Sequence, residues 1–283
     1  MKISIYITLV FLTFFIQVSA QGMKVVSAQR AFFAGKNFSM TITGAANETS
    51  SFRLKYANRT LLARQFKFDK NGIKVLELNF PKLNSYVIAE AEITFSSEKG
   101  TVSEKLFFFP EKGITQGDSE LTVIGEQALK DSLAKFGAKV LTVNDIERTQ
   151  TQSLIVQGID FNQYPGIERS LQKLCEGKRK IVFIGAKGTL SWPNGVRAIK
   201  LLDESYPKQF DKRFDVLKAK NSLFTSERDN LPVIKTIPGA KGLCFCQMKV
   251  GKGEIYILSD GVLENIKTNP SVLFLIKSLI GGK

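Results

Sequence analysis

The hydrophobic pattern of this chain changes once, across residues 110–119, and that change constrains the fold more than any other feature. Before it, short segments of alternating apolar and polar residues recur between turn signals such as the stretch Asp69 to Gly72. There are seven such segments: 24–27, 37–43, 51–56, 59–68, 72–80, 87–96 and 101–109. Their number and spacing favour an immunoglobulin-like β-sandwich, which we predict for residues 21–111.

Beyond a linker at residues 112–119, the pattern is that of strands alternating with helices. Continuous apolar runs predict buried strands at 121–125, 139–143, 153–158 and 180–185. Amphipathic segments at 126–136 and 165–176 predict helices, and a last helix is expected to begin with Asn269 as N-cap and Pro270 in its first turn. We therefore predict an α/β domain over residues 120–283, a parallel sheet with helices on both faces. The stretch 187–231 carries no clear pattern.

Residues 1–20 are predicted to be a secretory signal peptide. Lys2 precedes an almost wholly apolar run from Ile3 to Val18, and small residues end it at Ala20, so cleavage is expected before Gln21. The protein would then be exported, to a periplasm or to the outside. Retention of the segment as an anchor is the alternative, although a membrane span usually needs about 20 apolar residues. No stable membrane span is expected after cleavage.

The chain has no histidine. This excludes Ser-His-Asp and Cys-His catalysis and histidine-based metal sites, so we predict no catalytic residues of these kinds, no metal and no cofactor. A mechanism based on carboxylates or lysine remains open. The three cysteines, Cys175, Cys244 and Cys246, cannot form a closed disulfide framework. Buried thiols are the favoured interpretation, and a bridge from Cys175 to one of the other two is the alternative.

The net charge of +14 suggests affinity for polyanions such as acidic glycans, phosphorylated envelope polymers or anionic membrane faces, and the alternative is a basic surface that only keeps the protein in solution. The basic residues are spread along the chain without a stripe or a motif, so nucleic acid is not an expected partner. Sequons for N-glycosylation occur at Asn37, Asn47 and Asn58, and the sequence does not decide whether they are used.

Several polar residues follow predicted strands of the second domain: Glu126, Asp145, Asp160 and Lys187. Because ligands bind beyond the carboxyl ends of parallel strands, these are candidate ligand-binding residues. The alternative is that they cap helices and solvate loops. Trp192, the only tryptophan, is a candidate platform for stacking a sugar or, alternatively, a half-buried anchor of an irregular loop.

The second domain resembles the class I glutamine amidotransferase-like fold, a flavodoxin-like α/β sandwich, and in particular its non-catalytic version attached to some glycoside hydrolases. The resemblance lies in the strand sequences LTVIG at 121–125, LIVQG at 154–158, KIVFIG at 180–185 and GLCFCQMKV at 242–250. Active members place a nucleophilic cysteine on a strand-to-helix elbow and activate it with a histidine. Here the corresponding strand runs into Ala186 to Thr189 without a cysteine, so the resemblance implies only the scaffold and an association with carbohydrate processing.

Together these features predict an exported, non-catalytic binding or scaffolding protein whose partner is an envelope protein or a glycan. A hydrolase with a carboxylate-based site at the edge of the sheet, formed by two of Glu126, Asp145 and Asp160, is the alternative. A third interpretation is an assembly module that forms homo-oligomers.

Overall fold

The structure is a computed structural model, and it describes residues 22–84, 87–111, 120–135, 138–143, 145–191, 195–217, 221–228, 231–238, 244–263 and 266–281. The predicted signal peptide, its cleavage site, the predicted linker and Trp192 lie outside these ranges. The chain divides into two compact units, Met1–Pro110 and Glu111–Lys283.

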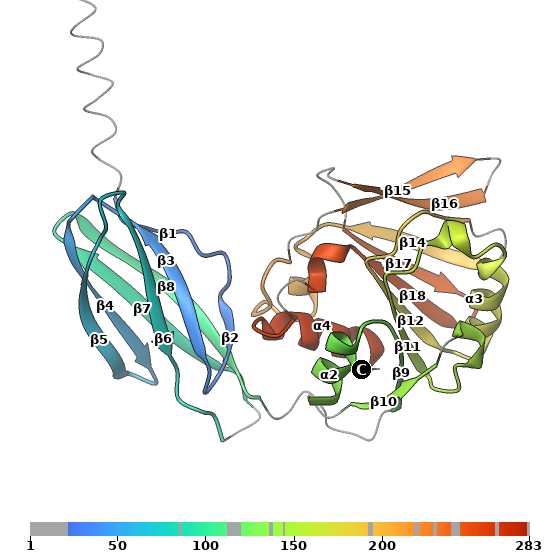
Figure 1. Cartoon of the computed structure of the whole chain (residues 1–283), viewed down its shortest axis with the longest axis horizontal. Coiled ribbons are helices and arrows are strands. Elements are labelled where there is room, and N and C mark those ends of the chain that lie inside the picture. Colours follow the sequence, from blue (N-terminus) through green and yellow to red (C-terminus); the bar gives the residue numbers. More distant parts are fainter. Residues whose placement is uncertain are drawn as a thin grey trace, which may run out of the picture. The chain divides into compact units, whose positions relative to one another are not determined.

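The first unit is a β-sandwich of two sheets (Figure 1). The smaller sheet has the order β1 (Lys24–Val25), β3 (Asn37–Thr43), β6 (Ile73–Asn79). The larger has the order β2 (Ala31–Phe33), β8 (Gly100–Phe109), β7 (Ala89–Ser97), β4 (Thr49–Tyr56), β5 (Arg59–Lys67). All pairings are antiparallel except that of β2 with β8. The all-β prediction for this segment is confirmed, with β2 as the strand that it missed.

Phenylalanines fill the space between the two sheets. On β3 the alternation buries Phe38 and exposes the flanking Asn37 and Ser39, because successive strand residues point to opposite faces. Phe80 stacks on Phe108 with ring centroids 3.8 Å apart, and Phe38 meets Phe108 edge-on at 5.3 Å. Burying one such ring stabilises the fold by about 1.5–3 kcal/mol. Residues 21–111 contain neither cysteine nor tryptophan, so this aromatic core forms without the disulfide and the tryptophan that antibody domains bury.

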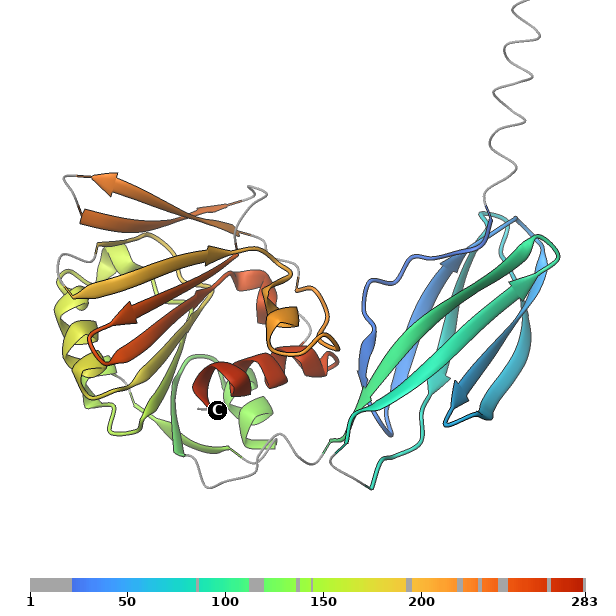
Figure 2. The same cartoon turned by 180° about the vertical axis from the view of Figure 1, so that it is seen from behind.

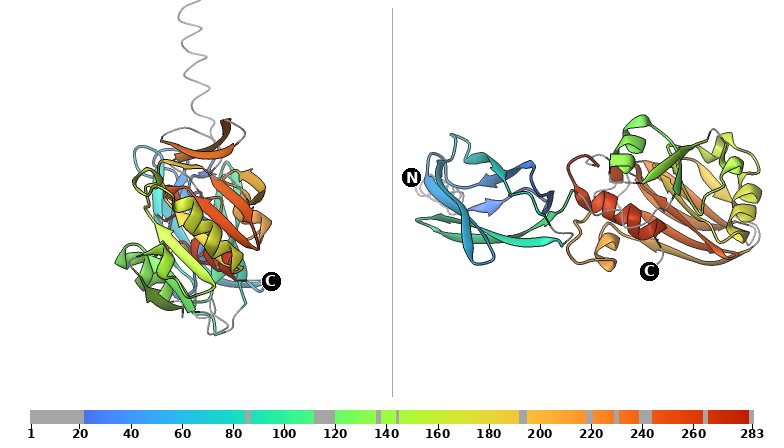
Figure 3. Two further views of the ribbon diagram at one scale, coloured as in Figure 1. Left: turned by 90° about the vertical axis from the view of Figure 1, so that its right-hand side faces the viewer. Right: turned by 90° about the horizontal axis from the view of Figure 1, so that it is seen from below.

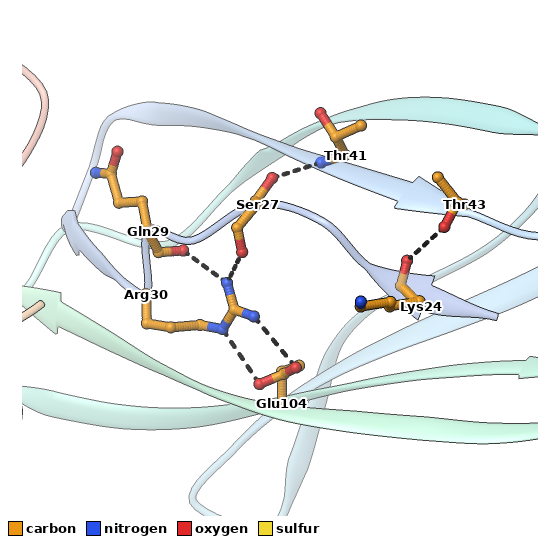
Figure 4. Close-up of polar contacts among 7 residues, drawn as sticks. All are labelled: Lys24, Ser27, Gln29, Arg30, Thr41, Thr43 and Glu104. Carbon is orange, nitrogen blue, oxygen red and sulfur yellow. Dashed lines mark hydrogen bonds and ion pairs between the residues drawn. The ribbon is translucent and has the colours of Figure 1, made fainter. Parts of the chain in front are cut away.

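The segment that crosses from β1 to β2 is held to both sheets by a polar network (Figure 4). Arg30 pairs with Glu104 of β8 through two contacts, Nε to Oε2 and Nη2 to Oε1, each 3.1 Å long. Its guanidinium also donates to the carbonyl oxygens of Ser27 and Gln29. Ser27 Oγ in turn accepts from the Thr41 amide of β3 at 2.7 Å. The bidentate pair fixes the point at which the chain changes sheets.

The second unit is built on a seven-stranded mixed sheet (Figures 1 and 2). Its order is β10 (Lys139–Thr142), β9 (Glu120–Ile124), β11 (Ser153–Gln157), β12 (Lys180–Ile184), β18 (Gly253–Leu258), β17 (Phe245–Val250), β14 (Val196–Leu202). The first five strands are parallel, whereas β17 and β14 pair antiparallel. A separate antiparallel sheet has the order β13 (Thr189–Ser191), β16 (Leu231–Pro238), β15 (Asn221–Arg228).

Three α-helices fall within the described residues: α2 (Gln127–Lys135), α3 (Ile167–Glu176) and α4 (Pro270–Ile280). The apolar stripe of α3, with Leu171 fully buried, joins a core that includes Phe183 of β12 and Ile257 of β18. The α4 helix is apolar on nearly all sides and contacts β12; it is the red helix near the C-terminus in the view from below in Figure 3. Short 3-10 turns are η2 (Ile146–Arg148), η3 (Phe161–Gln163), η4 (Tyr206–Gln209) and η5 (Asp260–Leu263).

The prediction of a flavodoxin-like α/β domain, a parallel sheet with helices on both faces, is wrong. Over the described residues the chain is mostly β, with eighteen strands and three α-helices. The segment between β12 and β17, which further helices would fill in a flavodoxin-like domain, forms the strands β13 to β16 instead. Residues 231–238 favour this outcome because four of these eight residues are valine, isoleucine or threonine, and Pro232 and Pro238 disfavour a helix. The resemblance to glutamine amidotransferases implied that fold, so it is wrong as well.

All three cysteines are buried and carry free thiols. Among the described residues, none of the helices has the length and apolar character that crossing a membrane requires.

Candidate functional site

A groove of about 640 Å³ lies at the carboxyl ends of β9 and β11. The strand order explains why it forms there. From β9 the chain moves to β10 on one side, and it then returns to β11 on the other side of β9. The loops that leave β9 and β11 therefore diverge, and a crevice opens between them, which is where ligands bind in parallel sheets.

The groove has an apolar floor and a polar rim. Ile124, Val156 and Ile159 come from the strand ends and the loop after β11. The polar lining is contributed by Asp145, Glu147, Gln157, Gln163, Tyr164 and Ser170. Such a surface combines a dry base with convergent hydrogen-bonding groups, as binding sites for small polar molecules do.

The two carboxylates come from one short turn. Asp145 caps η2, because its Oδ1 accepts from the Glu147 amide at 3.0 Å. The Glu147 carboxylate accepts a hydrogen bond from Ser170 Oγ of α3. This bond joins the loop after β10 to the helix after β11 and holds Glu147 at the rim of the groove.

Tyr164 is the aromatic side of the site. It follows η3, whose first turn is capped by Asp160, with Oδ1 accepting from the Asn162 amide at 3.0 Å. The Tyr164 amide closes that turn on the carbonyl of Phe161, and Pro165 and Gly166 lead directly into α3. The side chain is 52% exposed although it lines the groove, so its ring is available to a ligand.

The structure brings one of the five predicted site residues, Asp145, into the groove. Glu126 is exposed and not part of the lining, and its amide donates to Gln157 Oε1 at 3.1 Å. Asp160 and Lys187 are neighbours through their backbones, since the Lys187 amide donates to the carbonyl of Ile159 at 2.8 Å.

The side chains of Asp160 and Lys187 do not line the groove either, and Trp192 lies outside the described residues. A carboxylate-based hydrolase was expected to bring two of Glu126, Asp145 and Asp160 together in one cleft. Only Asp145 lines this groove, so the three do not converge there.

Sequence reasoning missed Glu147, Gln163, Tyr164 and Ser170. The available signal was the Tyr164-Pro165-Gly166 stretch, which follows a buried strand and precedes a helix. A short turn of this kind tends to leave its aromatic ring exposed, and Tyr164 is 52% exposed.

No family model matches the chain, and no curated protein sequence matches it. Solved structures give faint likenesses. WR4, a C. elegans MSP family member, is 13% identical, with 31% of this chain and 96% of that chain covered and a TM-score of 0.23. The eight N-terminal Ig domains of Down Syndrome Cell Adhesion Molecule are 10% identical, with 84% of this chain and 24% of that chain covered and a TM-score of 0.23.

A titin I-band fragment, I67–I69, is 11% identical, with 84% of this chain and 64% of that chain covered and a TM-score of 0.21. None of these three likenesses reaches a TM-score of 0.5. Their TM-scores are too low to support an argument about function.

Proposed function

We propose that this protein is an exported, non-catalytic binding protein, and that its second unit binds a glycan in the groove beside β9 and β11. The observation that carries the proposal is the exposed Tyr164 ring in a groove that also holds two carboxylates and two amides. The predicted signal peptide at residues 1–20 supports the export.

The chemistry of the groove suits a sugar. A tyrosine ring offers an apolar face on which the C–H face of a sugar ring packs, and its hydroxyl remains a hydrogen-bonding group. The Asp145 and Glu147 carboxylates accept hydrogen bonds from hydroxyl groups, and charge-assisted bonds of this kind are roughly twice as strong as neutral ones. The Gln157 and Gln163 amides donate as well as accept.

Binding without catalysis is favoured by the residues at hand. The chain has no histidine, so the usual general base is missing. Asp145 already accepts from the Glu147 amide and Glu147 from Ser170, so both carboxylates have a structural role as well as a place on the rim.

A glycan array followed by calorimetry on the full chain tests the proposal. Tyr164→Ala should weaken binding by about tenfold or more, because a stacked aromatic ring contributes on the order of 1 kcal/mol beyond its buried area. Tyr164→Phe, which keeps the ring, is the matched control and should stay within about twofold. Asp145→Asn removes the charge but keeps a residue that caps well, so it should weaken binding without unfolding the loop.

Equal binding by the chain and by Tyr164→Ala would contradict this site. Hydrolysis of a bound glycan that is abolished by Glu147→Gln would instead establish the carboxylate-based hydrolase, and no binding to any glycan would leave a protein partner as the better account.

A further inference from the structure

A second indentation, of about 430 Å³, lies on the outer face of the larger sheet in the first unit. It is lined across three neighbouring strands by Ser51, Arg53 and Lys55 of β4, Gln65 of β5, and Thr94 and Ser96 of β7. None of these residues belongs to the groove of the second unit.

The strand alternation aims these side chains at solvent. Phe52 and Leu54 of β4 point into the sandwich core, so Ser51, Arg53 and Lys55 point outward. The register places Arg53 between Thr94 of β7 and Ala63 of β5. Small side chains on either side of a long one create the indentation.

The surface around the indentation is strongly basic. The hairpin Thr49–Lys67 has no acidic residue and five basic ones: Arg53, Lys55, Arg59, Arg64 and Lys67. Arg53, Lys55 and Arg64 line the indentation. Two ion pairs of the sandwich use other cations, Arg30 with Glu104 and Lys105 with Glu90.

The nearest acidic residue by register is Glu92, which stands opposite Lys55 on β7. Glu92 also raises the pKa of Lys105, although less than Glu90 does through its hydrogen bond and charge. The three cations that line the indentation therefore outnumber the acidic groups beside it.

The polar groups between the cations point to the class of ligand. Hydroxyl and amide groups of Ser51, Gln65, Thr94 and Ser96 suit a partner that is hydroxylated as well as anionic. The described lining holds no exposed aromatic ring on which nucleic acid bases would stack. It also holds no exposed large apolar side chain that would enter a bilayer.

We propose that this indentation binds an anionic polysaccharide, whose carboxylate or sulfate groups pair with Arg53 and Lys55 while its hydroxyl groups meet the serine, threonine and glutamine side chains. Arg53 is suited to a bidentate contact with such a group, and Lys55 supplies a point charge. The site is separate from the glycan groove in position and in charge, so it stands whether or not the groove binds a sugar.

The test uses the full chain and three polymers of known charge: dextran sulfate, polygalacturonate and neutral dextran. The protein should bind at least one of the two anionic polymers and not neutral dextran, and binding should weaken as salt is added, since exposed charges are screened. Arg53→Gln with Lys55→Gln should weaken binding by about tenfold or more.

Lys70→Gln with Lys82→Gln is the matched control, because it removes two exposed charges from the same unit outside the indentation. It should change binding by no more than about twofold. Tyr164→Ala should leave binding to the anionic polymers intact, which separates this site from the groove. Thermal melting checks that each variant is folded. If the double variant is not folded, Lys55→Gln alone replaces it and should show a smaller but measurable loss of binding.

Three results would overturn the proposal: equal losses in the double variant and in its control, equal binding of neutral dextran, and no binding of either anionic polymer. Tighter binding of single-stranded DNA or of anionic phospholipid vesicles, with the same dependence on Arg53 and Lys55, would also overturn it in favour of a different partner.

Discussion

At the scale of single residues, Gly188 is the position where the loop after β12 has least room. Its φ is +80°, and a Cβ atom there would lie 2.7 Å from both Asp160 Oδ1 and Asn162 Nδ2. Asn162 Oδ1 also accepts from the Thr189 amide at 3.1 Å. The loops after β11 and β12 thus meet at a glycine because a side chain would separate them.

Gly188→Ala should lower the free energy of unfolding by roughly 2–4 kcal/mol, through backbone strain and the displaced contacts. Gly166→Ala is the control, because Gly166 has a φ of +81° but open space around it, and it should cost only about 1 kcal/mol. Urea denaturation measures both. Equal losses would mean that the contact with Asp160 and Asn162 contributes nothing.

The same loops show what single residues in a sequence can and cannot predict. That Asp160 and Lys187 follow buried strands was readable from the pattern. Whether a carboxylate then faces a groove or caps a turn depends on hydrogen bonds to its own backbone neighbours, as Asp145 and Asp160 show. Glu147 reaches the groove through a bond to Ser170, twenty-three positions away, and no local pattern carries that contact.

At the scale of elements, the start of α4 is the best-specified feature of the second unit. The sequence predicted Asn269 as its cap and Pro270 in its first turn, and the structure confirms both. Asn269 Oδ1 accepts from the Ser271 amide at 2.9 Å, and the buried Ser271 Oγ accepts from the Asp215 amide at 3.0 Å. Asn269 therefore caps the helix, and Ser271 ties the start of the helix to the backbone at Asp215.

Asn269→Ala should reduce stability by about 1–2 kcal/mol, because a helix amide loses its acceptor in a buried place. Asn269→Asp and Asn269→Ser keep an acceptor and should recover most of that loss. Thermal unfolding of the three variants side by side makes the comparison. A loss as large in the serine variant as in the alanine variant would show that packing, and not capping, is responsible.

Elements with a strong local sequence pattern were predicted well. Elements that become strands only because a neighbouring strand pairs with them were not. The strands of the sandwich and the strands β9, β11 and β12 show clear alternation or apolar runs. By contrast β14 is half-buried at best and includes Arg197 and Lys200, so its sequence does not look like a sheet strand. It is a strand because β17 provides a partner from Val196 to Leu202. The antiparallel pairings of β14 with β17 and of β17 with β18 make the sheet mixed where a parallel one was expected.

At the scale of the whole molecule, the two units differ in the weakly acidic side chains that they bury, which are thiols and tyrosine hydroxyls. All three cysteines are in the second unit, and burial raises the pKa of each, Cys175, Cys244 and Cys246, from 9.0 to about 12. Burial, with a smaller contribution from the charge of Glu254, also raises the pKa of Tyr206 to about 12. The sandwich contains no cysteine. High pH should therefore affect the second unit first.

The direction follows from the protonation states. As the pH rises from 9.0 toward about 12, the folded thiols stay mostly neutral, whereas thiols of the unfolded chain, with a pKa near 9.0, lose their protons. Ionisation of the thiols then favours the unfolded state. Below about pH 8 the thiols do not change the free energy of unfolding, and as the pH rises through this window they lower it. At about pH 10 the loss should be on the order of 1 kcal/mol for each thiol.

Urea denaturation followed by far-ultraviolet circular dichroism measures this directly. The midpoint should move to lower urea between about pH 8 and about pH 10. Cys175→Ala gives the control, since it lowers stability at both values but should weaken the pH dependence by about a third if the three thiols contribute equally. A midpoint that does not move would mean that the thiols ionise as readily inside the fold as outside it, which would contradict their burial.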